Sequence, residues 1–270
     1  MNSNLLTTKI VRSLRQDGFR ATLRKCLSNL KYDRFSSDDF DRRYGTDTGG
    51  LEPLWKFKIC SPNARFGASY QATQEQELAD AIDFLSENLQ TFTFIDLGCG
   101  KGRTLLVASN LGFKQVIGVE FVPDLVEIAR TNLTKMRIAN AVVLHADAAE
   151  FQFPDNDTVV YLYNPFSQEV LSKVIANLRE CCLKRLYIIY KVPRCAEIFD
   201  SSSFLTRFGS PPAVPDIQIW STVNTIAEHK PNHDLATVSM TKSPTENHSP
   251  YEFSPEAHSK FNVEVLLYEH

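Results

Sequence analysis

A glycine-rich turn between an apolar run and a helical pattern constrains this chain most. Residues 92–97 are almost entirely apolar, residues 98–102 read Gly-Cys-Gly-Lys-Gly, and a helical pattern follows over residues 103–111 and ends at Gly112. Three glycines let the backbone turn sharply and let a ligand approach the amide groups at a helix N-terminus. The sequence therefore predicts a strand–loop–helix unit that binds a ligand at its loop.

The alternation of strands and helices continues to residue 190. We expect further strands at 116–119, 141–145, 158–163 and 185–190, and helices that start near residue 74 and at 123–136 and 168–180. The strands are near-continuous apolar runs, as in parallel sheets that are covered on both faces. The sequence therefore predicts an α/β fold, a doubly wound, mostly parallel, Rossmann-like sheet with helices on both faces and right-handed crossovers.

The chain is predicted to divide into four segments. They are a helical and irregular N-terminal extension (1–65, helical over 1–33 and irregular over 34–68), the ligand-binding domain (66–221), a flexible insert (222–262) and a final strand (263–270). The insert is rich in Ser, Thr, Asn, His and Pro, which disfavours a packed core. A further strand is expected at 216–220, and one antiparallel strand is expected near the C-terminal end.

Composition excludes several classes of partner. The net charge is −3 over 270 residues, so no overall positive field attracts nucleic acid. The six cysteines show no paired spacing, which favours a reducing, cytoplasmic location. No apolar run approaches the ~20 residues that a transmembrane helix needs. The basic, amphipathic start of the chain fits a transit peptide, a membrane-surface anchor or a helix packed on the domain, and we favour the last.

The residues around the glycines indicate which ligand binds. A dinucleotide fingerprint requires a glycine at the position of Arg103. Asp96, two residues before the first glycine, would repel a pyrophosphate but suits a ligand with a cationic end. The amino group and sulfonium of S-adenosylmethionine (SAM) form such an end, so the charge pattern favours SAM over NAD.

Acidic residues also follow the next two predicted strands. Glu120 is placed to accept hydrogen bonds from both ribose hydroxyls, and Phe121 comes directly after it. Asp147 is placed to accept from an adenine amino group, while the amide of Ala148 addresses a ring nitrogen. Because ligands bind at the carboxyl ends of strands in open α/β sheets, acids at three successive strand ends predict a nucleoside site.

The fourth predicted strand ends in Asn164-Pro165-Phe166 and should adjoin the first strand. Pro165 fixes the turn and should bias Asn164 towards an extended conformation. The Asn164 side chain would then face the transferable methyl group and accept hydrogen bonds from an incoming amine. Phe166 and Tyr163 would supply an aromatic wall for a cationic substrate. The catalytic residues predicted here are Asn164, Pro165 and Phe166.

These motifs together resemble the class I SAM-dependent methyltransferases. Within them, residues 66–192 are similar to a bacterial branch that resembles the non-SET, disruptor-of-telomeric-silencing type of lysine methyltransferase. The resemblance implies that the segment around Tyr70 and Thr73 folds over the methionine part of SAM, although Ala72 replaces an expected proline. The implied cofactor site is Tyr70, Thr73, Asp96, Gly98, Cys99, Gly100, Gly102, Glu120, Phe121, Asp147, Ala148 and Asn164.

The predicted activity is transfer of a methyl group from SAM to a nitrogen of a protein or small-molecule amine. A small-molecule O- or C-methyltransferase and a SAM-binding module without catalysis remain alternatives, whereas a nicotinamide oxidoreductase is disfavoured. No metal is expected, because Pro231 interrupts any helix that would align His229 and His233. His145 is the nearest candidate base, but we interpret it as a strand residue. The methyl acceptor is not identified by the sequence.

Overall fold

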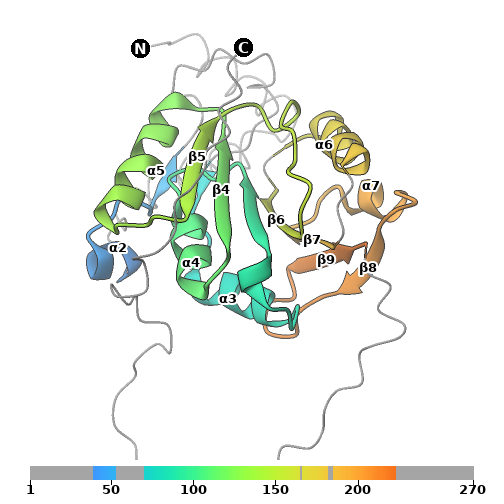
Figure 1. Cartoon of the computed structure of the whole chain (residues 1–270), viewed down its shortest axis with the longest axis horizontal. Coiled ribbons are helices and arrows are strands. Elements are labelled where there is room, and N and C mark those ends of the chain that lie inside the picture. The colour runs from blue at the N-terminus through green and yellow to red at the C-terminus, as the bar shows by residue number, and fades with distance from the viewer. Residues whose placement is uncertain (1–38, 53–69, 165, 182–184, 223–270) are drawn as a thin grey trace, which may run out of the picture.

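The computed structural model describes residues 39–52, 70–164, 166–181 and 185–222 (Figure 1). The predicted N-terminal helix over 1–33, most of the predicted insert and the predicted strand at 263–270 lie outside the described residues. His229 and His233 lie outside them as well.

A seven-stranded sheet forms the centre of the molecule, in the order β5-β4-β3-β6-β7-β9-β8. Its strands are β3 (Thr93–Leu97), β4 (Gln115–Glu120), β5 (Ala141–His145), β6 (Thr158–Tyr163), β7 (Leu186–Lys191), β8 (Thr206–Gly209) and β9 (Ile217–Ser221). The first five are parallel to their neighbours among themselves. The order reverses at β3, as in a doubly wound sheet. The predicted mostly parallel α/β fold is confirmed.

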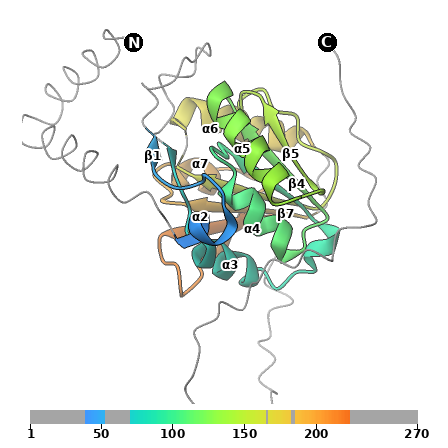
Figure 2. The same ribbon diagram turned by 90° about the vertical axis from the view of Figure 1, so that its left-hand side faces the viewer.

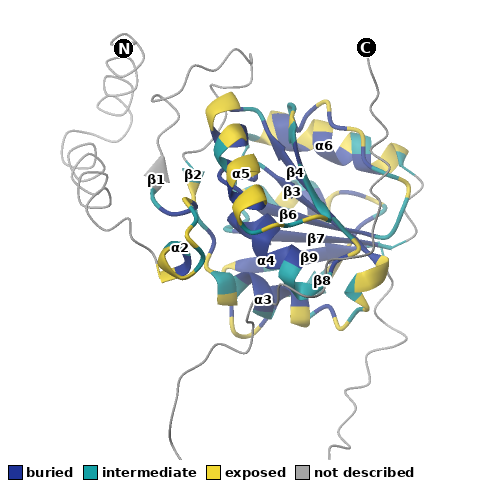
Figure 3. Cartoon of the chain, turned by 60° about the vertical axis from the view of Figure 1, so that its left-hand side comes forward, coloured by how far each residue is buried: buried dark blue, intermediate teal, exposed yellow. Residues whose placement is uncertain are grey.

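Helices cover both faces of this sheet (Figure 3). They are α3 (Glu75–Asp83), α4 (Arg103–Leu111), α5 (Pro123–Lys135), α6 (Gln168–Glu180) and α7 (Ala196–Asp200). One apolar cluster joins α3, α4 and α5 to one face, and a second joins α6 and α7 to the other. Successive strand residues point to opposite faces, so a strand such as β3, which is buried throughout, contributes to both clusters.

The C-terminal edge carries two antiparallel strands, not the single one predicted. β9 pairs with β7, and β8 pairs with β9 at the edge of the sheet. β8 was missed because none of its residues is fully buried, so the segment shows no apolar run. Edge strands need only one partner and bury little, which weakens their sequence signal.

The interpretation of residues 34–68 as irregular was wrong for its described part. Residues Asp39–Tyr44 form helix α2, and strand β1 (Leu51–Glu52) pairs with β2 (Tyr70–Gln71). Phe40 is 3% exposed and belongs to the same apolar cluster as α3 and α4, beside which α2 lies (Figure 2). A single buried aromatic residue in a polar run gives no periodic signal, so the helix could not be predicted.

Substituting Gly118 by alanine is expected to destabilise the fold. A Cβ atom on Gly118 would lie 2.6 Å from the Cys99 Sγ and 2.6 Å from a Leu105 methyl carbon. Overpacking of this kind costs about 1–3 kcal/mol. Urea denaturation should show this loss, and Cys99→Ala in the same chain should restore part of it. An unchanged unfolding midpoint for Gly118→Ala would contradict this packing.

Candidate functional site

The carboxyl ends of β3 and β6 lie side by side at the point where the strand order reverses. Asp96 on β3 pairs in register with Tyr161 on β6 and with Gly118 on β4. The expectation that the fourth predicted strand adjoins the first is confirmed. Residues that follow these strands therefore meet at one edge of the sheet, where open α/β sheets bind ligands.

The glycine loop after β3 has the conformation that its sequence predicts. Gly98, Gly100 and Gly102 have φ values of 90°, 54° and 85°, which residues with a Cβ atom rarely adopt. The amides of Gly98 and Cys99 donate to the carbonyl of Val119, at 2.8 and 3.2 Å, and tie the loop to β4. Gly102 then begins α4 without a side-chain cap, so its helix N-terminus presents backbone amides alone.

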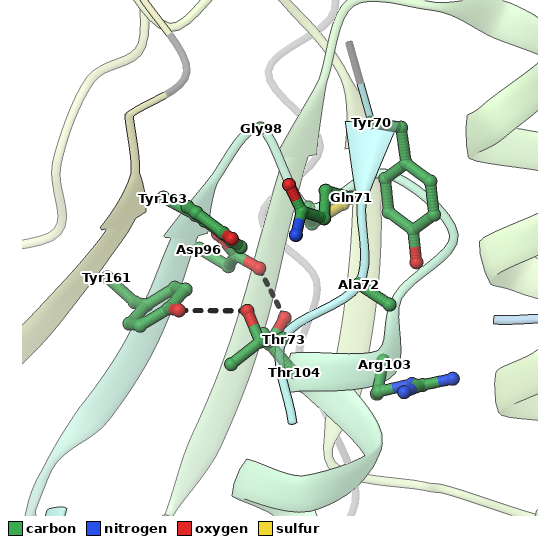
Figure 4. Close-up of a pocket in the computed structure, with 11 residues that line it drawn as sticks. Tyr70, Gln71, Ala72, Thr73, Asp96, Gly98, Arg103, Thr104, Tyr161 and Tyr163 are labelled. Atoms are coloured by element: carbon green, nitrogen blue, oxygen red, sulfur yellow. Dashed lines mark hydrogen bonds between the residues drawn. The ribbon is translucent and has the colours of Figure 1, made fainter. Parts of the chain in front are cut away.

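A small cavity of about 20 Å³ lies beside this loop (Figure 4). Its lining residues are Tyr70, Gln71, Ala72, Thr73, Asp96, Gly98, Cys99, Arg103, Thr104, Tyr161 and Tyr163. A space of that size holds a group no larger than a water molecule or an ammonium group. It would therefore take only the tip of a larger ligand, whose remainder would extend along the strand ends.

Asp96 supplies a buried carboxylate to the cavity. Its side chain accepts a hydrogen bond from the hydroxyl of Thr104 on the first turn of α4. Burial raises the pKa of Asp96 to about 7, against the effect of that hydrogen bond, and the negative charge of Glu120 adds to the rise. A buried carboxylate that is costly to ionise favours a cationic ligand group beside it.

Glu120, at the end of β4, is held by backbone amides. Its two carboxylate oxygens accept from the amides of Gly100, at 2.9 Å, and Val122, at 3.0 Å. Burial raises the pKa of Glu120 to about 6, although these bonds act to lower it. Each oxygen has a second lone pair, so the carboxylate can still accept from a diol. It also links the glycine loop to the end of β4.

The remaining predicted nucleoside contacts lie outside the cavity lining. Asp147 is half-buried and accepts from the amide of Ala149 at 2.9 Å, within its own turn, and Ala148 is buried. Phe121 packs beside Val122 in a small apolar cluster that also contains Tyr70. The structure thus gathers Tyr70, Thr73, Asp96, Gly98 and Cys99 around the cavity. The roles assigned to Phe121, Asp147 and Ala148 stay predictions.

Asn164 does not have the extended conformation that was expected before a proline. Its φ is 40°, in the left-handed region, which asparagine tolerates better than most residues. Its side-chain oxygen accepts from the hydroxyl of Tyr190 on β7 at 3.3 Å. Pro165 lies outside the described residues, and Phe166 packs against the apolar cluster beneath α6. Of the predicted aromatic wall, Tyr163 lines the cavity.

Several cavity residues were not predicted from the sequence. Tyr161 bonds the hydroxyl of Thr73 at 2.8 Å, and Thr104 bonds Asp96 (Figure 4). Tyr161 reaches the site because its strand pairs with β3 in register, which no local pattern reveals. A hydroxyl in the first helical turn after the glycines was the one available signal for Thr104.

The described residues contain no helix long and apolar enough to cross a membrane. Among them there is also no cluster of three or more His, Cys, Asp or Glu side chains arranged to hold a metal ion.

Known proteins with similar sequences include methyltransferases. The ribosomal protein L11 methyltransferase of Hamiltonella defensa subsp. Acyrthosiphon pisum is 32% identical over 124 residues, which cover 44% of this chain and 38% of that protein. The protein of the same name from Clostridium perfringens (strain 13 / Type A) is 37% identical over 68 residues, covering 25% of this chain and 22% of that protein. The chain thus spans well under half the length of these relatives.

Solved structures with a similar chain path include a ribosomal protein L11 methylase from Lactobacillus delbrueckii subsp. bulgaricus. Its TM-score is 0.42 at 16% identity, covering 55% of this chain and 79% of that one. A putative methyltransferase from Escherichia coli has a TM-score of 0.45 at 16% identity, covering 61% and 97%.

The glycine loop, both buried acids and the tip of β6 all fall within one family match. Residues 94–184 match the family described as "Methyltransferase domain". That segment is a methyltransferase domain of the class I type, which uses SAM as its methyl donor.

Proposed function

We propose that the whole chain is a SAM-dependent methyltransferase that transfers a methyl group to a nitrogen of a protein or small-molecule amine. The observation that carries this proposal is the buried carboxylate of Asp96 in a cavity lined by Tyr163, one residue before Asn164. A cation-seeking group and a polar strand tip therefore share one edge of the sheet. The binding site for the methyl donor would therefore lie next to the binding site for the amine that accepts the methyl group.

The residues of the glycine loop and the neighbouring strand ends would hold the cofactor. Asp96 would accept from its ammonium group, and the amides at the N-terminus of α4 would face its carboxylate. Glu120 would accept from the ribose hydroxyls, with Asp147 and Ala148 beyond it at the adenine. When bound, SAM would supply a methyl group on a sulfonium, which already contains a good leaving group.

The tip of β6 would align the acceptor. The side-chain oxygen of Asn164 has a lone pair beyond the one that Tyr190 engages, and it would accept a hydrogen bond from the amine. Tyr163 would pack against the acceptor, with its face already near the ammonium group of Lys191, at 5.2 Å. Alignment and exclusion of water are the main contributions that a protein makes to such a displacement.

A protonated amine must lose a proton before it attacks. His145 is exposed, and its ring nitrogen lies 3.3 Å from the carbonyl of Phe121, away from the cavity lining. That placement argues against His145 as a base. We propose that the amine is deprotonated by solvent before it enters the site.

A protein acceptor is supported by the relatives named ribosomal protein L11 methyltransferase, although this chain covers only a part of them. Membership of the branch that resembles disruptor-of-telomeric-silencing enzymes is part of this proposal, and it would place Tyr70 and Thr73 over the methionine part of SAM. Both residues line the cavity, which supports the proposed contact with the methionine part of SAM. A cytoplasmic location is part of the same proposal.

Excess SAM or S-adenosylhomocysteine is expected to raise the melting temperature of the protein. A ligand at about a hundred times its dissociation constant stabilises the fold by ~2.7 kcal/mol. For a domain of this size that is a rise of about 5–10 °C. Differential scanning fluorimetry would measure it, with NAD as the matched control ligand. A rise with NAD alone would overturn the proposal and favour an oxidoreductase.

The nature of the acceptor is tested with SAM that carries a tritiated methyl group. Label in the protein fraction of a cell extract supports a protein acceptor, and label in the small-molecule fraction supports a small amine. Release of the label as methanol in base identifies carboxyl methyl esters, and mass spectrometry of the product separates N-methyl groups from methyl ethers. Cofactor binding without any labelled product would favour the non-catalytic binding module.

A further inference from the structure

The segment before the domain makes an unexpected set of contacts with the glycine loop. Residues 40–49, here called the strap, lie beside α4, and two buried side chains of the loop region point into it. They are Lys101 and Arg103, of which 5% and 4% is exposed. Figure 4 shows the Arg103 side chain turned away from Asp96 and Thr73, although it lines the same cavity.

Arg103 is engaged by the strap on three sides. Its Nε donates to the hydroxyl of Thr48 at 2.9 Å, and its guanidinium carbon lies 4.9 Å from the centre of the Phe40 ring. One of its terminal nitrogens lies 3.7 Å from the carboxylate of Asp41. Arg103 is also the first residue of α4 after the last loop glycine. The strap therefore holds the first turn of α4, the helix that follows the glycine loop.

Lys101, which belongs to the glycine loop, is also held by residues of the strap. Its ammonium group donates to the carboxylate of Asp47 at 2.9 Å and to the carbonyl of Gly49 at 3.1 Å. The side chain of Asn132 on α5 completes the attachment. It donates to the carbonyls of Asp47 and Lys101, at 2.8 and 3.0 Å, and accepts from the amide of Asp47 at 3.0 Å.

Asp41 organises the strap itself. Its carboxylate accepts from the amide and hydroxyl of Thr48, at 2.8 and 2.6 Å, from the amide of Gly49 at 2.6 Å and from the hydroxyl of Thr46 at 2.7 Å. Burial acts to raise the pKa of Asp41, but these hydrogen bonds outweigh it and lower the pKa. These donors therefore favour a charged carboxylate, which presents Thr48 and Gly49 to the loop.

The strap also reaches the far side of the cavity. The hydroxyl of Tyr70 donates to the carbonyl of Thr48. The Tyr70 ring lies so close to the loop that a Cβ atom on Gly100 would come 2.1 Å from it. The loop is thus enclosed between the strap, Tyr70 and the end of β4, and Thr48 of the strap contacts both Tyr70 and Arg103.

We infer that Asp41 is a positioning residue of the cofactor site, which acts through Thr48 on Arg103 and Tyr70 and thereby sets the shape of the glycine loop. The inference rests on the proposed function and extends it to a segment outside the family match. A loop that is held in its binding conformation before the cofactor arrives loses less entropy on binding. Asp41 itself would touch neither the cofactor nor the acceptor.

The test compares Asp41→Asn with Asp39→Asn in the full chain, using calorimetric titration with S-adenosylhomocysteine. The first substitution would turn a side-chain amide towards groups that are themselves donors, whereas Asp39 is 79% exposed on the same helix and pairs with Arg42 beside it. We expect Asp41→Asn to raise the dissociation constant about tenfold or more, as loss of 1.4 kcal/mol would. Asp39→Asn should change it less than about twofold.

Thr48→Val is the second, milder variant, since it removes the hydroxyl that joins Asp41 to Arg103 but keeps the side-chain shape. Both variants should raise KM for SAM more than they lower kcat, and both should speed hydrogen exchange at the amides of residues 100–103. All titrations are run well below the melting temperature of each variant.

Wild-type affinity for S-adenosylhomocysteine in both variants, with only a lower melting temperature, would overturn the inference and leave the strap a purely stabilising element. A wild-type chain that does not bind S-adenosylhomocysteine would instead overturn the proposed function, and the inference with it. Binding of S-adenosylhomocysteine by the wild-type chain therefore distinguishes the two failures. The exchange rates of residues 100–103 report, without any ligand, whether the strap orders the loop.

Discussion

Asp96→Asn is expected to raise the melting temperature of the cofactor-free protein while it weakens cofactor binding by about a hundredfold or more. The Asp96 carboxyl has a pKa of about 7 in the fold, compared with 3.8 for an exposed aspartate, because it is buried and lies near Glu120. Above pH 7 such a group costs up to about 4 kcal/mol of folding free energy. Asparagine has the same shape and carries no charge, and the hydroxyl of Thr104 can still donate to its oxygen.

The sign of the pH dependence follows from the raised pKa. Below pH 3.8 the carboxyl is protonated in both states and contributes nothing to the pH dependence. Between 3.8 and about 7 the unfolded chain loses the proton and the folded chain keeps it, so stability falls as pH rises. Thermal unfolding of the wild type and of Asp96→Asn should therefore diverge across this window, with the variant about 4 °C or more higher at pH 8.

Asp155→Asn is the matched control, because Asp155 is an exposed carboxylate in a loop. Its removal should change neither the melting temperature nor the affinity for S-adenosylhomocysteine. Affinity for S-adenosylhomocysteine, which keeps the ammonium group of the cofactor, should be lost in Asp96→Asn by about a hundredfold or more. A variant that is less stable at pH 8, or one that still binds normally, would contradict the role of Asp96 as a buried partner for a cation.

The central part of the fold was predictable because two local signals agreed there. The helix over residues 168–180 was predicted to the residue, as apolar positions recur at helical spacing and one face is buried. The strand at 158–163 was also predicted to the residue. Five of its six residues are buried, and such a strand gives a short, nearly continuous apolar run in the sequence. Gly112, at φ 94°, ends α4 where the sequence predicted.

The parts that the sequence did not reveal depend on contacts between distant segments. The strap is one case. Thr48 donates to Asp41 and accepts from Arg103, and no periodicity relates these residues. Phe40 is similar, because the Arg103 guanidinium that lies over its ring is 63 positions later in the chain. Tyr161 is another, since its place opposite Asp96 depends on strand register.

The prediction from local sequence was also wrong at Asn164. A residue that precedes a proline usually has an extended backbone, so an extended conformation was expected there. The left-handed φ of 40° places the Asn164 oxygen within 3.3 Å of the Tyr190 hydroxyl, so a tertiary contact outweighs the local preference. Residues in uncommon backbone conformations concentrate at functional sites. The conformation therefore supports the proposed role, and it also determines how that role must be tested.

Asn164→Ala is expected to lower kcat for methyl transfer about a hundredfold, which is the scale of losing alignment of a reacting group. The dissociation constant for S-adenosylhomocysteine should change less than about threefold, because the proposed cofactor contacts of Asp96 and Glu120 remain. Single-turnover transfer of a tritiated methyl group to the acceptor fraction measures the rate of methyl transfer, and calorimetry measures the dissociation constant.

Asn164→Gly separates the side chain from the backbone. Alanine at φ 40° adds strain of about 1–2 kcal/mol, whereas glycine adopts that conformation freely. If the amide side chain aligns the acceptor, both variants lose the same activity although only alanine loses stability. If Asn164→Gly turns over like the wild type, the position matters only for its backbone. Asn110→Ala, at the far end of α4, is the control that should leave transfer unchanged.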